Sequence, residues 1–197
     1  MQTIREEHKD DDVLIALGEI ESELNAKKYG LVWEQHEEAV DLQMRANIPV
    51  FTECTDKEIT ADAGNSYNFI LEGDNLHSLR LLEKTHAGRI DFIYIDPPYN
   101  TGNKDFIYDD TYVSADDGYF HSKWLSFMAK RLLSAKSLLS DEGIILISID
   151  DTEYANLKLL CDEIFSERNF MGTFIWKSRQ VVDSRNRTHI SNDHEYI

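Results

Sequence analysis

The sequence predicts an α/β fold in which a parallel sheet is flanked by helices, and three features support this prediction. Residues 90–95 and 144–149 are almost wholly apolar, as in strands that are buried on both faces of a parallel sheet. Segments with apolar residues at helical spacing lie before, between and after these two strands. Because strands and helices alternate, we expect consecutive strands to run parallel and to be joined by right-handed crossovers.

The first third of the chain differs from the rest. We predict an N-terminal helical arm and linker over residues 1–62, followed by a partial α/β domain over residues 63–197. Within the arm, apolar spacing predicts one helix over residues 13–28 and a second that runs from Trp33 through Met44 and ends before the proline at position 49. An arm of this kind would serve contacts with a partner or with a second copy of the chain.

The predicted domain starts with a strand over residues 68–71 and a helix over residues 75–84. The apolar strand over residues 90–95 comes next. It leads into a loop over residues 100–118 that is rich in Gly, Asp, Asn and Tyr, and a loop of this length is usually functional or disordered. A helix over residues 119–139 follows, with its large apolar side chains at mixed helical spacing.

The end of the domain is predicted to continue the same alternation. A turn at Asp141-Glu142-Gly143 leads into the second apolar strand. Thr152 is expected to cap a helix that ends near residue 165, since a threonine hydroxyl can bond the free N–H groups of a first turn. Strands are predicted over residues 170–176 and from residue 195 to the end of the sequence.

The run Asp96-Pro97-Pro98-Tyr99 carries the chemistry of this sequence. It follows the strand over residues 90–95, and ligands of open α/β sheets bind at the carboxyl ends of strands. The two prolines cannot continue a sheet ladder, so they hold the backbone in an extended turn. A carboxylate and an aromatic ring held rigidly there suit chemistry on the exocyclic amine of a nucleobase. The carboxylate would accept a hydrogen bond from the amine, and the ring would stack on the base.

The longer run from Tyr94 to Asn103 resembles the catalytic motif of the adenine-N6 DNA methyltransferases of type III restriction-modification systems, which are their modification subunits. The similarity extends from about Tyr29 to the last residue. It includes further runs in the same order, at residues 28–33, 49–53, 72–76, 124–128 and 194–197. Together these runs make the resemblance much more specific than the four-residue motif alone.

The resemblance implies a Rossmann-like methyltransferase sheet, S-adenosyl-L-methionine as cofactor, and double-stranded DNA with a flipped adenine as substrate. It also implies a modification-subunit homodimer and a restriction (helicase-nuclease) subunit as partners. Asp96 would accept from the adenine amine, the Pro97 carbonyl would be the second acceptor, Pro98 would fix their placement and Tyr99 would stack on the base. An acidic residue near the cofactor is implied at Asp74, with Asn75 beside it, although Asp74 would equally suit an N-cap.

One feature departs from the family. These enzymes hold the methionine part of the cofactor in a Phe-x-Gly-x-Gly loop, and no Gly-x-Gly occurs in this chain. In the type III group that loop follows the target-recognition region, so the resemblance implies an N-terminal fragment of a longer enzyme, with little or no activity of its own. Two alternatives stay open. One is cytosine-N4 methylation, whose enzymes more often carry Ser at position 96, and the other is an inactive fragment that binds modification or restriction subunits.

Composition narrows the setting without deciding the function. The net charge is −17, which is unusual for a DNA-binding protein, and only residues 168–197 are net basic. No run of apolar residues is long enough for a membrane span, and no secretory signal is present. Two cysteines, Cys54 and Cys161, are too far apart to suggest a zinc site, and no metal is expected. These features predict a cytoplasmic protein.

Overall fold

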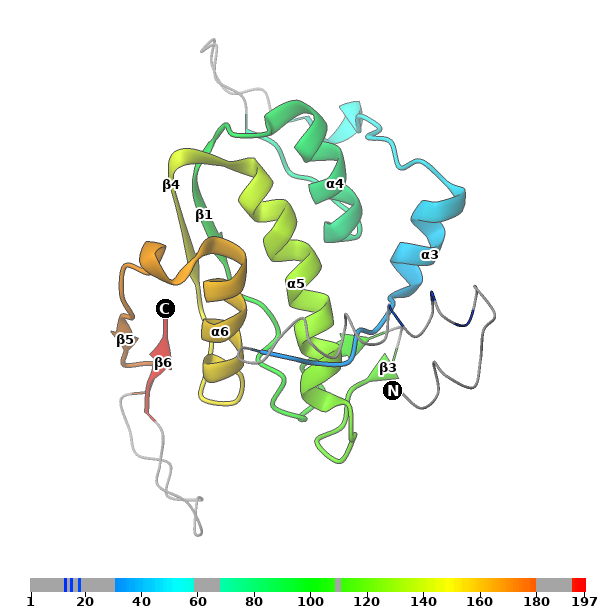
Figure 1. Cartoon of the computed structure of the whole chain (residues 1–197). Helices are drawn as coiled ribbons and strands as arrows, with labels where there is room; N and C mark the ends of the chain where they lie inside the picture. Colours follow the sequence, from blue (N-terminus) through cyan, green and yellow to red (C-terminus); the bar gives the residue numbers. More distant parts are fainter. Residues whose placement is uncertain are drawn as a thin grey trace. The chain divides into compact units, whose positions relative to one another are not determined.

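The computed structural model describes residues 31–58, 68–108, 111–179 and 193–197, together with Val13, Ile15 and Gly18, which are helical (Figure 1). Apart from these three residues, the predicted helix over residues 13–28 lies outside the described residues, and so do residues 180–192. The chain divides into two compact units, residues 1–33 and 34–197. The description below concerns the second unit, in which the α/β elements lie.

The centre of this unit is a pair of parallel strands, β1 (Ile90–Ile95) and β4 (Leu139–Ile147). Phe92 lies beside Ile144 in the register, and the last residues of the two strands, Ile95 and Ile147, are also paired. This confirms the predicted strand over residues 90–95 and its parallel neighbour. The turn expected at residues 141–143 is wrong, because β4 already begins at Leu139. Residues 140–143 lie within the strand, at the point where its register with β1 shifts.

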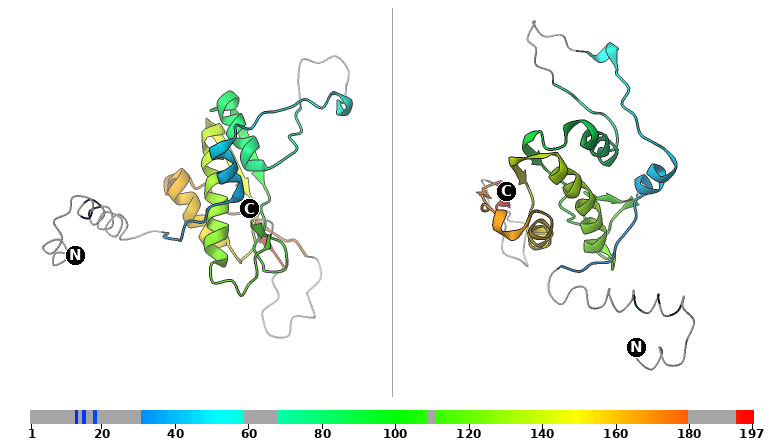
Figure 2. Two further views of the ribbon diagram at one scale, coloured as in Figure 1. Left: turned by 90° about the vertical axis from the view of Figure 1, so that its right-hand side faces the viewer. Right: turned by 45° about the horizontal axis from the view of Figure 1, so that its top comes forward.

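Three helices lie on one side of this strand pair, as Figures 1 and 2 show: α4 (Asn75–His86), α5 (Phe120–Leu138) and α6 (Tyr154–Phe165). α5 is the central helix, and it packs against both α4 and α6. Its buried face includes Trp124 and Leu132, neither of which is exposed at all. The three predicted helices are therefore confirmed, with changes of a few residues at their ends.

The start of α6 differs in its cap. Glu153, not Thr152, occupies the N-cap position. The backbone N–H of Thr152 donates to the carboxylate of Asp150 at 2.8 Å, so this N–H is bound within the loop that precedes the helix. Asp150 thus stabilises the loop before the helix, and Thr152 does not cap the helix with its hydroxyl.

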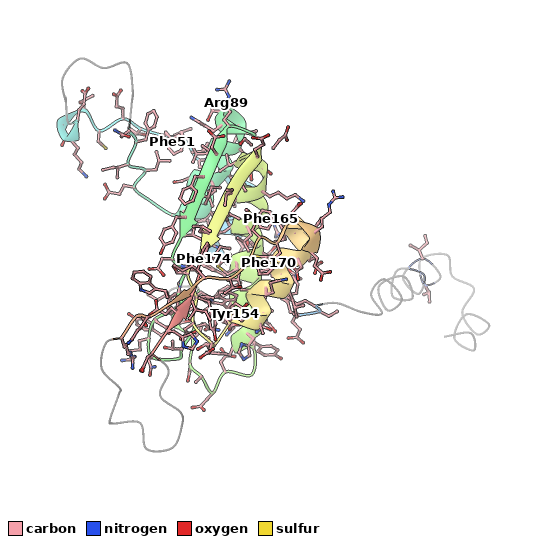
Figure 3. All side chains as sticks on the ribbon, turned by 90° about the vertical axis from the view of Figure 1, so that its left-hand side faces the viewer. Phe51, Arg89, Tyr154, Phe165, Phe170 and Phe174 are labelled. Atoms are coloured by element: carbon pink, nitrogen blue, oxygen red, sulfur yellow. The ribbon has the colours of Figure 1, made fainter. Side chains whose placement is uncertain are left out.

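The opposite face of the strand pair is apolar and exposed. Figure 3 shows the helices on one side of β1 and β4 only. Phe92 and Tyr94 are two positions apart in β1 and so lie on the same face, where they are 57% and 53% exposed. Ile144, which is paired with Phe92, is 39% exposed. Within the described residues β1 is also paired along one edge only. Apolar strands of a parallel sheet are normally covered on both faces, so this face is incomplete by itself.

The strand predicted over residues 68–71 is wrong. These residues belong to no helix or strand, and Phe69 and Ile70 are 73% and 90% exposed. The pattern indicated a buried strand because its side chains are apolar. No described element covers those side chains, so the burial that the pattern requires is missing.

The helix predicted from Trp33 through Met44 begins later than expected, since α3 spans Ala39–Ala46. The residues before it bond to α5 instead of to one another. The backbone N–H of His36 donates to the hydroxyl of Ser126 at 3.0 Å, and that hydroxyl donates to the carbonyl of Glu34 at 3.3 Å. Hydrogen bonds to a packed helix replace the first turn of the predicted one.

α3 is held to α5 by charged side chains. Arg131 is buried and makes two parallel 3.0 Å hydrogen bonds to the carboxylate of Glu38, a geometry that only a guanidinium provides. Lys130 pairs with Asp41 in the first turn of α3. Burial acts to raise the pKa of Asp41, but the bonds from Lys130 and from the backbone of Glu38 outweigh it and lower that pKa.

The long loop predicted over residues 100–118 contains a short antiparallel hairpin, β2 (Ile107–Tyr108) and β3 (Thr111–Tyr112). It is anchored by Phe106, which is fully buried and meets the ring of Phe127 edge-on at 5.2 Å between centroids. The polar composition of the loop did not indicate this aromatic contact, and Tyr108 is also buried beside Phe106. The loop is therefore folded against α5, although its length and composition suggested a functional or disordered segment.

The last strands are antiparallel, which differs from the all-parallel expectation. β5 (Ile175–Trp176) pairs with β6 (Glu195–Tyr196), so the strand predicted over 170–176 is shorter than expected and the one at 195 is confirmed. Ile149 and Tyr196 exchange backbone hydrogen bonds of 2.9 and 2.8 Å. Two single turns, η1 (Thr55–Lys57) and η2 (Glu167–Asn169), complete the described elements.

A methyl group added at Gly143 would fit badly against the neighbouring strand. A Cβ there would lie 2.8 Å from the carbonyl oxygen of Ile90 and 3.1 Å from the backbone nitrogen of Ser140. We expect Gly143→Ala to reduce the free energy of unfolding by about 1–3 kcal/mol, because backbone atoms must move apart. Urea unfolding measures this. Gly118→Ala is the control, since nothing lies within 4 Å of its Cβ, and equal effects would contradict the analysis.

The Asp41–Lys130 pair predicts a pH dependence of stability. A carboxyl whose pKa is lowered by folding stabilises the protein above its unfolded pKa, near 3.8, and this stabilisation is lost as the pH falls through the lower, folded value. Asp41→Asn should therefore cost about 1 kcal/mol at pH 7 and less at pH 3. Urea unfolding at the two pH values tests this. A variant equally destabilised at both pH values would contradict it, and Asp116→Asn, in an exposed loop, is the control.

Candidate active site at the end of strand β1

The strand ladder stops where the Asp96–Tyr99 turn begins. The last interstrand bond runs from the N–H of Ser148 to the carbonyl of Ile95 at 3.0 Å. Asp96 follows and is exposed, whereas Pro97 and Pro98 are half-buried. A carboxylate in this position is open to solvent at the carboxyl end of a strand, which is the position that the sequence predicts for it.

The turn is fastened to α5 through a single buried donor. The indole Nε1 of Trp124 donates to the carbonyl of Pro98 at 2.7 Å, and the indole is not exposed at all. The Pro97 carbonyl accepts no hydrogen bond from the described part of the chain. One of the two proline carbonyls is therefore a structural anchor, and the other stays available to a ligand.

The ring of Tyr99 is held from the far end of the chain. Its hydroxyl donates to the carboxylate of Glu195 in β6 at 3.3 Å, across 96 positions of sequence. Burial raises the pKa of Tyr99, and the neighbouring carboxylates of Asp96 and Glu195 raise it further. The phenol therefore stays neutral and keeps its proton for this hydrogen bond, which orients the ring beside Asp96.

A buried polar network lies directly behind the turn. Asn100 is fully buried, and its backbone is in the left-handed region with φ 61°. Its Nδ2 donates to Glu153 at 2.5 Å and to the carbonyl of Phe120 at 3.3 Å. Glu153, which is also fully buried, accepts from His121 Nδ1 at 2.7 Å as well. The network thus joins His121 to the fully buried carboxylate of Glu153.

Asp74 and Asn75 have structural contacts at the start of α4. Asp74 caps the helix by accepting from the N–H groups of Leu76 at 2.8 Å and His77 at 3.4 Å. The side-chain oxygen of Asn75 accepts from Nε of Arg131 at 2.7 Å. The predicted N-cap role of Asp74 is thus confirmed, and the cofactor role of both residues stays a prediction.

The residues present do not fit a complete methyl-donor site. Asn75 is engaged by Arg131, one oxygen of Asp74 is engaged by its own helix, and the sequence has no Gly-x-Gly motif that would let the backbone approach the donor closely. The other acidic pair at a strand end, Asp150 and Asp151, is also engaged. Asp151 accepts from the hydroxyl of Tyr196 at 2.6 Å, a bond that raises the pKa of this phenol.

Metal and thiol chemistry find no support in the part of the chain that the structure describes. No group of three or more His, Cys, Asp or Glu side chains is arranged to hold an ion among the residues searched. Both cysteines are free, and burial raises the pKa of Cys161 to about 12, so that thiol stays protonated. None of the helices that the structure describes has the length and apolar content to cross a membrane.

Three residues of the site were missed by sequence reasoning: Trp124, Glu153 and Glu195. Trp124 and Glu195 lie in runs that carry the resemblance, yet nothing local indicates that they reach the Asp96–Tyr99 turn. Glu153 could have been found, because it follows the end of the strand next to β1. The carboxyl ends of neighbouring parallel strands meet at one edge, so acidic residues there are candidates for the same site.

The arrangement suits the recognition of an amino group on a flat ring. The same turn carries an exposed carboxylate, a carbonyl that accepts no bond from the described chain and a phenol held by Glu195, and its two prolines restrict the backbone. Residues 90–197, more than half of the chain, match the family model described as DNA methylase. The chain therefore belongs to this family of N6/N4 DNA methylases, for which a Rossmann-like sheet is expected.

Its relatives include modification subunits. The chain is 43% identical over 158 residues to the StyLTI Mod subunit, a type III restriction-modification enzyme of Salmonella typhimurium, with 70% of this chain and 24% of the relative covered. It is 34% identical over 203 residues to the EcoP15I Mod subunit of Escherichia coli, covering 90% and 31%. The type II methyltransferase M.KpnI of Klebsiella pneumoniae is 48% identical over 127 residues, covering 64% and 30%. The predicted resemblance is confirmed, and the chain spans about a quarter to a third of these relatives.

The Trp124–Pro98 hydrogen bond yields a stability prediction. Trp124→Phe keeps most of the buried ring but leaves the Pro98 carbonyl without its donor, and an unsatisfied buried acceptor costs about 1–3 kcal/mol. The free energy of unfolding in urea should fall by that amount. The matched control is Trp176→Phe, at a position 61% exposed, which should change stability by less than about 0.5 kcal/mol. Equal losses in the two variants would show that the indole N–H has no special role.

Proposed function

We propose that this chain forms the amine-binding half of a site-specific adenine-N6 DNA methyltransferase that uses S-adenosyl-L-methionine. The observation that carries the proposal is the Asp96–Tyr99 turn. It combines an exposed carboxylate, a carbonyl at Pro97 that accepts no bond from the described chain, and the oriented ring of Tyr99. Membership of the DNA methylase family supports the reaction class.

The chemistry of the target explains why these groups belong together. The lone pair of an adenine N6 is delocalised into the ring, which makes this nitrogen a poor nucleophile. Hydrogen bonds accepted from its two N–H groups, by Asp96 and by the Pro97 carbonyl, favour a pyramidal nitrogen and stabilise the positive charge that develops on it. Tyr99 would stack on the adenine once the base has left the duplex. Pro98 acts indirectly, because its carbonyl bond to Trp124 fixes the position of its neighbours.

Adenine is preferred over cytosine on one observation. N4 of cytosine is an amine of the same kind, and the same acceptors would serve it. Asp96 presents a full negative charge to the nitrogen, whereas cytosine-N4 enzymes more often present a serine at this position. We therefore assign adenine, and an assay with both bases as methyl acceptors distinguishes the two substrates. Methylation of cytosine alone would overturn this assignment.

The methyl donor requires more than this chain provides. Asp74 and Asn75 are proposed as its contacts on this side of the site, but both are held by neighbouring groups. The curated relatives are three to four times longer than the matched part, since it covers only 24–31% of each. We propose that the corresponding additional polypeptide supplies the glycine-rich donor loop and the region that reads the DNA sequence.

The open face of the strand pair supports this division. Phe92, Tyr94 and Ile144 form an exposed apolar surface that further methyltransferase elements would cover. Residues 63–197 would then be part of one catalytic domain, and the arm of residues 1–62 would contact other subunits. By analogy with the Mod relatives, these are a second modification subunit and a restriction (helicase-nuclease) subunit. The free thiols suit the cytoplasm.

The alternative is an inactive fragment that binds modification or restriction subunits, for which the same apolar face would serve. Its prediction differs in one respect. A binder leaves adenine unmodified whatever is added to it, whereas the amine-binding half of an enzyme becomes active when the missing half is present. The presence or absence of methylated adenine therefore separates the two readings.

Asp96→Ala tests the proposed function. The chain is mixed with the remaining region of a Mod relative, S-adenosyl-L-methionine and duplex DNA, and N6-methyladenine is measured by mass spectrometry. We expect methylation only in the mixture, and its reduction by about 100-fold or more in Asp96→Ala, since one charged transition-state contact is lost. Asp116→Ala, an exposed loop acid, is the matched control and should retain full activity. Undiminished methylation by Asp96→Ala would refute the role of this carboxylate.

A further inference from the structure

We infer that Glu153 is a positioning residue, which holds the Asp96–Tyr99 turn in shape through Asn100. The inference rests on the proposed function for its purpose, although the geometry it concerns can be measured without DNA or a methyl donor. Glu153 lies at the N-cap of α6, 53 positions from Asn100 in sequence, and its side chain is fully buried.

The burial of Glu153 is the first argument. A buried carboxylate is costly unless hydrogen bonds replace its water, and an apolar side chain of similar volume would cost less. Glu153 accepts from Asn100 at 2.5 Å, from His121 at 2.7 Å and, through its second oxygen, from Asn156 at 2.7 Å. Both oxygens are therefore occupied. They are occupied by donors from the turn, from α5 and from α6 itself, so one carboxylate joins three parts of the site.

The backbone of Asn100 is the second argument. At φ 61° this residue is in the left-handed region, which is unfavourable for a residue with a side chain because Cβ approaches the following carbonyl oxygen. Asparagine tolerates the region better than most residues do. Here Nδ2 is bound by Glu153 and by the Phe120 carbonyl, while Oδ1 accepts nothing from the described residues. The Glu153 bond therefore opposes relaxation of Asn100 to an ordinary φ.

The left-handed backbone of Asn100 matters because of its position in the chain. It directly follows Tyr99, so its φ sets the direction in which the chain leaves the turn. The turn is fixed on one side by the Trp124–Pro98 bond and on the other by the Asn100–Glu153 bond. Loss of the second attachment would leave only the Pro98 bond and the 3.3 Å bond from Tyr99 to Glu195, and the backbone between Pro97 and Asn100 would shift.

The test uses the whole chain and the indole N–H signals of its three tryptophans in ¹H–¹⁵N NMR spectra. The signal that disappears in Trp124→Phe reports on the bond to Pro98. Glu153→Leu, which fills the volume without an acceptor, should shift this signal from its native position. Glu153→Gln retains an acceptor for Asn100 and should leave the signal close to native. Ser134→Ala, at another buried polar position on α5, is the control and should not shift it.

A second substitution separates positioning from general destabilisation. Glycine adopts a positive φ without any supporting bond, so Asn100→Gly added to Glu153→Leu should restore the native Trp124 signal. A folded Glu153→Leu chain with an unchanged signal would overturn the inference, and so would a failure of Asn100→Gly to restore it. If Glu153→Leu does not fold, Asn100→Ala and Asn100→Gly are compared in the native background. Only the alanine should shift the signal, and equal spectra would overturn the inference.

Activity then connects this geometry to the proposed function. In the reconstituted mixture Glu153→Leu should lower adenine methylation by about 100-fold, the effect of a small misplacement of reacting groups, and Asn100→Gly should recover most of it. A shifted and restored Trp124 signal, with no methylation by the native mixture, would support the positioning role while defeating the proposed function. A native level of methylation in Glu153→Leu, together with a shifted signal, would overturn the inference that this geometry serves the reaction.

Discussion

The site depends on one constraint, which is that the β1–β4 ladder ends abruptly at a pair of prolines. The bond from Ser148 to the carbonyl of Ile95 is the last rung, and the next residues cannot continue the pairing. The polar groups of Asp96 and Pro97 are therefore free of the sheet at the point where a rigid strand delivers them. In a longer ladder the Pro97 carbonyl would accept a hydrogen bond from the sheet. In a flexible turn the Asp96 carboxylate and the Tyr99 ring would have no fixed relative position. Rigid presentation of unused acceptors is what the rest of the fold provides.

Side chains from other elements fix the shape of the Asp96–Tyr99 turn and of Asn100 after it. Trp124 of α5 takes the Pro98 carbonyl, and Glu153 of α6 takes the side chain of Asn100. Glu195 of β6 takes the phenol of Tyr99, so three different elements each fix one residue of a five-residue stretch. None of these contacts is local in sequence. The turn therefore acquires its final shape only when the whole unit has folded, and under the proposed function its groups would need little reorganisation on binding a base.

Sequence reasoning predicted the elements whose signal is periodic and buried. The strand over residues 90–95 and the helices around 75–84, 119–139 and 152–165 were found because apolar spacing and parallel-sheet burial act within each segment. It failed where the outcome is decided by distant partners. Residues 68–71 look like a strand but are largely exposed, and Glu34 and His36 bond to Ser126 rather than forming a helical turn. In the site, Asp96 and Tyr99 are visible in the motif, whereas Glu195 and Glu153 become relevant only through tertiary contacts.

The uncovered face of the strand pair has a consequence for how the isolated chain behaves in solution. Phe92 and Tyr94 expose apolar rings on a strand that, within the described residues, is paired along one edge only, a combination that promotes association of like chains. A net charge of −17 opposes that association, because identical acidic molecules repel one another. Aggregation should therefore depend on ionic strength, since salt shortens the range of this repulsion and leaves the exposed apolar face unchanged. The acidity that looks unsuited to a DNA enzyme then serves as a solubility device.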